Sequence, residues 1–258
     1  MAQNYTLGRG KVYFSRFKPN TQVPAGFLYI GNTPEFSLTI ESETLDHYSS
    51  DEGIREKDDS VPLEVTRTGS LITDNIDPAN VGLFFFGTNS TVAQAAVASS
   101  SETLPSVKKG HSYRLGITAG NPTGYSGIDQ AGFAVNVAGT PAVVNNDFVM
   151  DYDTGLLTFN PASALIVDGV DVSVTFAVRS STRSRVISGS TPVEGAMQYV
   201  AKNPKGKNFD YFLPYVKVTP NGDYALKGDE WQQIPFSLEA LKPANGEAIY
   251  MDGRPIYA

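Results

Sequence analysis

The stretch Pro34–Thr73 constrains the fold more than any other part of this 258-residue chain. Apolar and polar residues alternate over Phe36–Ile40 and again over Val61–Thr66. A two-residue period is typical of a strand with one buried face. The residues between them, Ser42–Ser60, include few apolar side chains and keep no sustained period. Because compact domains rarely retain so long a connection unless it is functional or disordered, the sequence predicts a long loop joining two strands.

Most of the net charge of the chain lies in this predicted loop. Its seven acids and two bases give −5, and the whole chain has a net charge of −7. Two interpretations are open: a solvated hairpin tip, or an assembly arm that crosses to another subunit. The candidate contact residues of the arm are Glu43, Asp46, His47, Tyr48, Asp51, Glu52, Arg55, Glu56, Lys57, Asp58 and Asp59.

Composition favours a mainly β protein with many short strands joined by turns, because Gly (24) and Pro (16) are plentiful. The absence of Cys excludes disulfides and thiolate metal sites. No apolar run approaches the roughly 18 residues of a membrane helix, and the first residues do not have the pattern of a signal peptide. We therefore expect a cytoplasmic protein that does not enter a membrane. Its acidic balance argues against tight nonspecific DNA binding.

One short helix is expected over residues 77–87. Asp77 suits the N-cap, Pro78 suits the first helical position, and Gly87 suits the end. The face expected to pack on a sheet consists of Val81, Phe84 and Phe85.

The middle of the chain predicts an inserted block. Residues 88–110 are small and polar and suggest a loop or linker, and a β-rich block follows at 111–180, with its clearest alternation at Val170–Val178. This block is either a small sandwich inserted into the first domain or a set of strands that extends the same sheet. We favour the insertion, which assigns residues 1–110 and 181–258 to one β core.

Two further features come from the last third of the sequence. Pro214 interrupts the predicted strand Phe209–Val218, which places that strand near an edge or an end. Basic residues gather after the block and are candidates to receive the acidic arm of another copy. They are Arg179, Arg183, Arg185, Lys202, Lys205 and Lys207.

No catalytic constellation is recognisable, so we expect neither an enzyme nor a cofactor. The chain has two His and no Cys nucleophile, and no phosphate-binding glycine loop follows a strand. Asp147, Asp151 and Asp153 have an alternating spacing that could attract calcium, but they lack the D-x-[DN]-x-[DN]-G loop and its distal glutamate. We interpret them as hairpin-turn carboxylates and expect no metal.

Part of the chain resembles a known family. The runs Pro34-Glu35-Phe36, LDHYSSDEGIREKD at 45–58 and Asp74-Asn75-Ile76 resemble the major tail tube proteins of tailed bacteriophages. The match covers roughly residues 8–88 and, more loosely, 196–242. It implies a tail-tube-type β-sandwich or barrel with one short helix and a long strand-connecting loop, plus the β-rich insertion. It also implies that the two strands belong to the inner wall of a hexameric ring and that the loop contacts the adjacent ring.

The same resemblance implies a structural virion protein. Its partners would be copies of itself and the tape measure, initiator and terminator proteins of the tail. Viral DNA would pass through the lumen without specific binding, and assembly would occur in the host cytoplasm. If the polar parity faces inward, the lumen residues are Ser37, Thr39, Glu41, Glu64, Thr66 and Thr68. The rival hypothesis is a carbohydrate-binding or adhesive β module, which predicts a monomer with an exposed aromatic platform.

Overall fold

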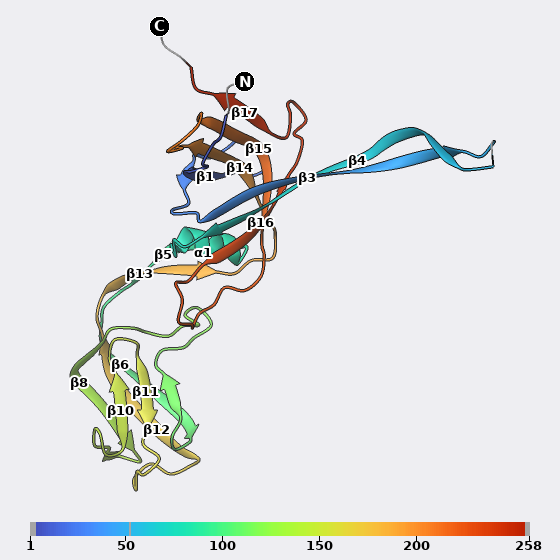
Figure 1. The fold of residues 1–258 in the computed structure, drawn as a ribbon. Coiled ribbons are helices and arrows are strands. Elements are labelled where there is room, and N and C mark those ends of the chain that lie inside the picture. The colour runs from blue at the N-terminus through green and yellow to red at the C-terminus, as the bar shows by residue number, and fades with distance from the viewer. Residues whose placement is uncertain (1–3, 52, 256–258) are drawn as a thin grey trace. The chain divides into compact units, whose positions relative to one another are not determined.

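The chain is mainly β, as the alternation predicts (Figure 1). The computed structural model describes residues 4–51 and 53–255. Thr91–Ser184 form one compact unit, called unit 2, and the described residues on either side form unit 1. No helix in this described part is both long enough and apolar enough to cross a membrane.

Unit 1 is built on an eight-stranded sheet. Its strand order is β2-β1-β14-β15-β16-β4-β3, with β17 paired to β15, and neighbouring strands run antiparallel. The strands are β1 (Gly10–Arg16), β2 (Leu28–Tyr29), β3 (Glu35–Ser49), β4 (Glu56–Thr73), β14 (Val193–Ala201), β15 (Phe209–Pro220), β16 (Ile234–Ala240) and β17 (Tyr250–Gly253).

The core of unit 1 lies on one face of this sheet, because the register aligns the apolar parity of neighbouring strands. Phe236 lies opposite Leu71, and Leu71 lies opposite Phe36. The same face includes Met197 and Leu213, which are also paired and fully buried. Burying each large apolar side chain contributes about 1.5–3 kcal/mol before conformational entropy is subtracted.

The single helix of the described residues, α1 (Pro78–Phe84), begins as predicted. The side chain of Asp77 accepts a hydrogen bond from the Ala79 amide, at 2.8 Å. The predicted apolar face is wrong at one residue. Phe85 is 40% exposed, whereas Leu83 is buried in the core, because the helix ends at Phe84 and residue 85 no longer follows its periodicity.

Pro214 does not mark an edge strand, which corrects the prediction. β15 has β14 on one side, and on the other it pairs with β17 through Phe212 and with β16 from Val216 onward. Pro214 falls in the gap between these two partners and at a register shift against β14. A proline is tolerated in a central strand at such an irregularity because no neighbour requires its missing N–H.

Unit 2 consists of two sheets with one shared core, of orders β10-β11-β7 and β6-β12-β8-β9. Its strands therefore do not extend the sheet of unit 1. The buried residues include Phe159 and Phe176, one from each sheet. The strands are β6 (Val97–Val107), β7 (Ser112–Arg114), β8 (Ile128–Val137), β9 (Thr140–Pro141), β10 (Phe148–Asp151), β11 (Leu156–Phe159) and β12 (Val170–Val178).

The polar segment 88–110 is not a loop, contrary to the prediction. It contains β5 (Thr88–Gln94) and β6, and β5 pairs with β13 (Ser181–Ile187) in a two-stranded sheet. Unit 2 accordingly begins at residue 91 instead of 111. Many side chains of β5 and β6 are exposed, so these strands do not show the apolar alternation by which a half-buried strand is recognised.

Candidate assembly surfaces

The acidic arm is a β-hairpin and not a loop, which corrects the main prediction for this region. β3 and β4 pair in an antiparallel ladder from Glu35 opposite Ile72 to Ser49 opposite Glu56. Only residues 50–55 connect them, and Glu52 lies outside the described residues. β4 also pairs with β16, but only over Thr68–Thr73. The outer part of the hairpin is therefore a two-stranded ribbon that extends away from the sheet (Figure 1).

This ribbon exposes apolar side chains that a soluble hairpin normally buries. Its exposed aliphatic residues are Ile40, Leu45, Val61, Leu63 and Val65, each between 44% and 63% accessible. β3 is also the last strand of the sheet order, so its outer edge has no partner strand among the described residues. A two-stranded hairpin is marginally stable by itself, and an unpaired edge is a template for another chain. Both properties point to a partner that covers the ribbon.

Polar contacts organise the outer end of the hairpin. Asp46 lies 2.6 Å from Lys57 Nζ and accepts a hydrogen bond from Ser60 Oγ at 2.8 Å. The hydrogen bonds from Lys57 and Ser60 lower the pKa of Asp46. His47 Nδ1 lies 2.6 Å from Asp58 Oδ1, and this hydrogen bond lowers the pKa of Asp58.

Two other predicted contact residues near the turn also meet. The guanidinium of Arg55 stacks over the Tyr48 ring at 5.0 Å, an arrangement that is worth about 0.5–1 kcal/mol at exposed sites. The acids Glu43, Asp51, Glu56 and Asp59 form no ion pair among the described residues. The outer end of the hairpin thus keeps uncompensated negative charge.

The six predicted lumen residues lie on one face of the hairpin. Thr39 is opposite Thr68, and Glu41 is opposite Thr66. Ser37 is opposite Ser70, and their hydroxyl oxygens lie 2.8 Å apart. Directly opposed residues of an antiparallel pair project to the same side, so the parity inferred from the sequence is the parity of the ladder. The polar face is also the face opposite the unit 1 core.

This polar face continues across the sheet onto residues that sequence reasoning did not select. One row runs from Thr68 to Glu239, then to Lys217 and Glu194. A second row runs from Ser70 to Ser237 and Thr219. The alternation of Ile234–Ala240 shows that Ser237 and Glu239 share a face, but only the register shows that they lie beside the hairpin residues.

The six basic docking candidates do not form one group. Arg179 and Arg183 belong to unit 2 and have partners there. Arg179 lies 3.8 Å from Asp153, and Arg183 donates to Gln94 Oε1 at 3.2 Å. Arg185 lies in β13 and also has a partner. Lys202, Lys205 and Lys207 belong to unit 1 and form no ion pair within the described residues.

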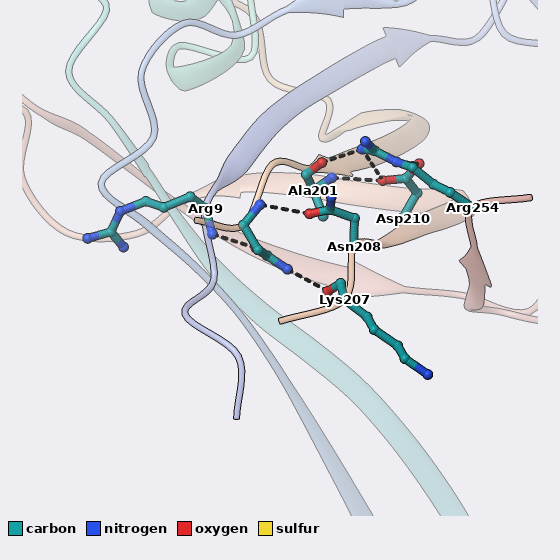
Figure 2. Close-up of polar contacts among 7 residues, drawn as sticks. Arg9, Ala201, Lys207, Asn208, Asp210 and Arg254 are labelled. Atoms are coloured by element: carbon teal, nitrogen blue, oxygen red, sulfur yellow. Dashed lines mark hydrogen bonds and ion pairs between the residues drawn. The ribbon is translucent and has the colours of Figure 1, made fainter. Parts of the chain in front are cut away.

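Backbone and Asn203 hydrogen bonds tie the segment of these three lysines to the chain around Arg9, and Figure 2 shows Lys207 and Arg9 in this network. The amide of Lys202 donates to the Arg9 carbonyl at 2.6 Å, and the Arg9 amide donates to Asn203 Oδ1 at 2.9 Å. Asn203 Nδ2 donates in turn to the Lys207 carbonyl at 2.8 Å. The Leu7 amide donates to the Lys205 carbonyl at 3.1 Å.

The ends of the Arg9 and Lys207 side chains make none of the contacts drawn in Figure 2.

We define the basic corner as Arg9, Lys202, Lys205, Lys207 and Arg254. Its acids are Asp210 and Asp252, which lie opposite each other on the paired strands β15 and β17. Arg254 pairs with Asp210 at 3.2 Å. Five cations and two acids leave this corner with a net charge of +3.

A cleft of about 730 Å³ lies next to the basic corner, at the base of the hairpin. Three rings form its aromatic wall: the Phe36 and Tyr199 centroids lie 5.8 Å apart, and those of Tyr199 and Tyr211 lie 6.1 Å apart. Burial raises the pKa of Tyr199. Leu38 and Arg9 also line the cleft. Sequence reasoning missed this site because its residues come from β1, β3, β14, β15 and the loops beside them.

Two of the three aspartates considered for calcium, Asp147 and Asp151, accept hydrogen bonds from loop residues. Among the described residues no three His, Cys, Asp or Glu side chains are placed to hold a metal ion. Asp151 Oδ1 accepts from the amides of Asp153 and Thr154, which is a turn contact. Asp147 is buried and accepts from the Val143 amide at 2.8 Å and from Ser163 Oγ at 2.6 Å.

Asp147→Asn should destabilise the protein by about 1–3 kcal/mol at pH 7, since an amide cannot replace both acceptor oxygens of a buried carboxylate. These hydrogen bonds, first that of Ser163 and then that of Val143, lower the pKa of Asp147. Its stabilisation is therefore complete above the ordinary Asp range near pH 4 and is lost as the pH falls through the lowered value. Chemical unfolding at pH 7 and pH 3 should show the variant's deficit shrinking in acid. The exposed Asp153→Asn is the matched control, and an equal loss in both variants would contradict this role.

Comparison with known proteins places the chain in a family. No curated protein matches it. A family model described as protein of unknown function UCP028589 matches residues 5–248, nearly the whole chain. This description names no activity, so the resemblance to tail tube proteins remains a prediction. The protein belongs to the UCP028589 family.

Proposed function

We propose that this protein is a structural subunit that assembles with copies of itself into stacked rings around a channel, as a major tail tube protein does. The rings are hexameric in the family it resembles, and the channel passes the viral genome. Tape measure, initiator and terminator proteins would then be its partners in the virion tail. The subunit needs no catalytic group or cofactor for this role.

The observation that supports this proposal is the long hairpin at the end of the unit 1 sheet. It combines an unpaired edge on β3 with five exposed aliphatic side chains on a two-stranded ribbon, all among the described residues. A neighbouring copy that pairs with the edge and packs on the ribbon would bury both. Closing a sheet around a ring removes unpaired edges, as it does in a barrel.

The polar face of the sheet suits a channel for DNA. Its acids Glu41, Glu43, Glu64, Glu194 and Glu239 outnumber its bases Lys217 and Lys11. Duplex DNA has one negative charge per about 1.7 Å, and basic side chains would bind it. A mainly acidic wall leaves phosphates without partners, so a genome would slide past.

The carbohydrate-binding alternative requires an exposed aromatic platform. In unit 2 the aromatic residues Tyr113, Tyr125, Phe133 and Tyr152 instead pack against the buried core. Trp231, in the loop between β15 and β16, is 93% exposed but makes no ring contact with another aromatic side chain of the described residues, so it forms no platform. The observations therefore favour assembly over glycan binding.

Concentrated purified protein should form rings or tubes without any added cofactor. Negative-stain electron microscopy and light scattering over a concentration series measure this directly. The physical reason is the exposed apolar ribbon, which is buried only on association. A protein that stays monomeric at every salt concentration, even when tail initiator proteins are added, would overturn the proposal.

A further inference from the structure

We infer that the cleft at the base of the hairpin receives the outer end of the hairpin from a second copy of this chain. This inference rests on the proposed self-assembly and adds the site at which one copy holds the next. Four features support it: the lining of the cleft, the charge at its rim, the chemistry of the hairpin end, and the distance between the two.

The cleft offers an apolar wall with a basic rim. Phe36, Tyr199 and Tyr211 form a chain of ring contacts, and Leu38 extends this surface toward the exposed side chain of Ile40. Arg9 lines the cleft and joins it to the basic corner. An apolar pocket with cations at its edge fits an apolar side chain that is flanked by acids.

The outer end of the hairpin has this chemistry. Ile54 is 76% exposed in the connection between β3 and β4. Acids surround it in the sequence, and residues 42–60 have a net charge of −5 against +3 for the basic corner. Among the described residues, Glu56 and Asp59 form no ion pair that would compete with a docking partner.

The geometry makes the contact head-to-tail. Eleven residues separate Leu38 in the cleft wall from Ser49 at the end of β3, and at about 3.3 Å per residue they span roughly 35 Å. The end of the hairpin therefore points away from its own cleft and is placed to reach that of another copy. Each copy offers both surfaces, so a contact that is not reciprocal repeats from copy to copy and builds a stack. The expected distance between the clefts of successive copies is roughly 35 Å, the length of the ribbon.

Because the chain has no Cys, introduced cysteines are its only thiols, and disulfide cross-linking can report which residues meet. The variant Ile54→Cys/Thr33→Cys places one thiol at the hairpin end and one on a residue that lines the cleft. Under mild oxidation it should form a ladder of covalent trimers and larger species, since a disulfide needs Cα atoms within about 7 Å. The matched control Ile54→Cys/Thr219→Cys places the second thiol on the polar sheet face and should give at least about tenfold less ladder. The single variant Ile54→Cys should give dimers at most.

Light scattering of the same samples before oxidation separates the two proposals. Assembly together with a disulfide-linked pair of peptides, one with position 54 and one with position 33, supports the cleft as the acceptor. Assembly without that link, or with an equal ladder in the Thr219→Cys control, overturns the cleft while self-assembly stands. Samples that neither scatter nor cross-link overturn both.

Discussion

Replacing residues 42–65 with Asn-Gly should give a folded protein that no longer assembles. The two-residue turn suits a type I′ hairpin and would connect Glu41 to Thr66, which lie opposite each other in the ladder. The part removed pairs with no strand outside the hairpin among the described residues, because β4 meets β16 only over Thr68–Thr73. We expect no rings or tubes by electron microscopy at concentrations where the wild type forms them. The melting temperature should stay within about 2 °C, which corresponds to less than 1 kcal/mol in a chain of this size.

The control for this deletion shortens a different exposed loop of the same sheet. Residues 225–230 lie between β15 and β16, and replacing them with Gly-Ser should leave assembly intact. Tubes formed by the hairpin deletion would show that the arm is not the assembly element. A fall of more than about 5 °C in its melting temperature would instead assign the arm to the fold of the subunit.

Charge reversal at either end of the proposed contact should weaken assembly, and reversal at both ends together should restore it. The hairpin-end variant is Glu56→Lys/Asp58→Lys/Asp59→Lys, and the corner variant is Lys202→Glu/Lys205→Glu/Lys207→Glu. An exposed ion pair contributes only about 0–1 kcal/mol, but three pairs in each contact act together and repeat around a ring. Each variant alone should need at least about tenfold more protein to assemble, which corresponds to about 1.4 kcal/mol. The variant with all six changes keeps the net charge and the complementarity, so it should assemble like the wild type.

A matched reversal tests whether position or total charge matters. Asp223, Asp229 and Glu230 are exposed, and their change to Lys alters the net charge as much as the hairpin-end variant does. Assembly of this control should be unaffected. Raising the salt should weaken wild-type assembly as well, because the Debye length falls from about 10 Å at 0.1 M to 3 Å at 1 M. The electrostatic contact would be contradicted if the variant with all six changes failed to assemble. It would also be contradicted if the control lost as much assembly as the hairpin-end variant.

Several features of this protein follow from local sequence alone. The N-cap at Asp77 and the proline after it predict the start of α1, because capping depends on residues within one turn. The alternation at Val170–Val178 predicts β12, since this strand has one buried face. The same parity argument selects one face of the hairpin for Ser37, Thr39 and Glu41. The acidic charge of the arm is also a property of the sequence alone.

The tertiary structure decided the rest. The strands within Ser42–Ser60 and the strand β5 have no apolar alternation, because no buried face selects for one where both sides of a two-stranded ribbon meet solvent. Pro214 is tolerated in a central strand only because two partners of β15 end on either side of it. The cleft joins Arg9 and Phe36 to Tyr199 and Tyr211 across most of the chain length. Its existence depends on strand register, which is fixed by the packing of the whole sheet and not by any local stretch of residues.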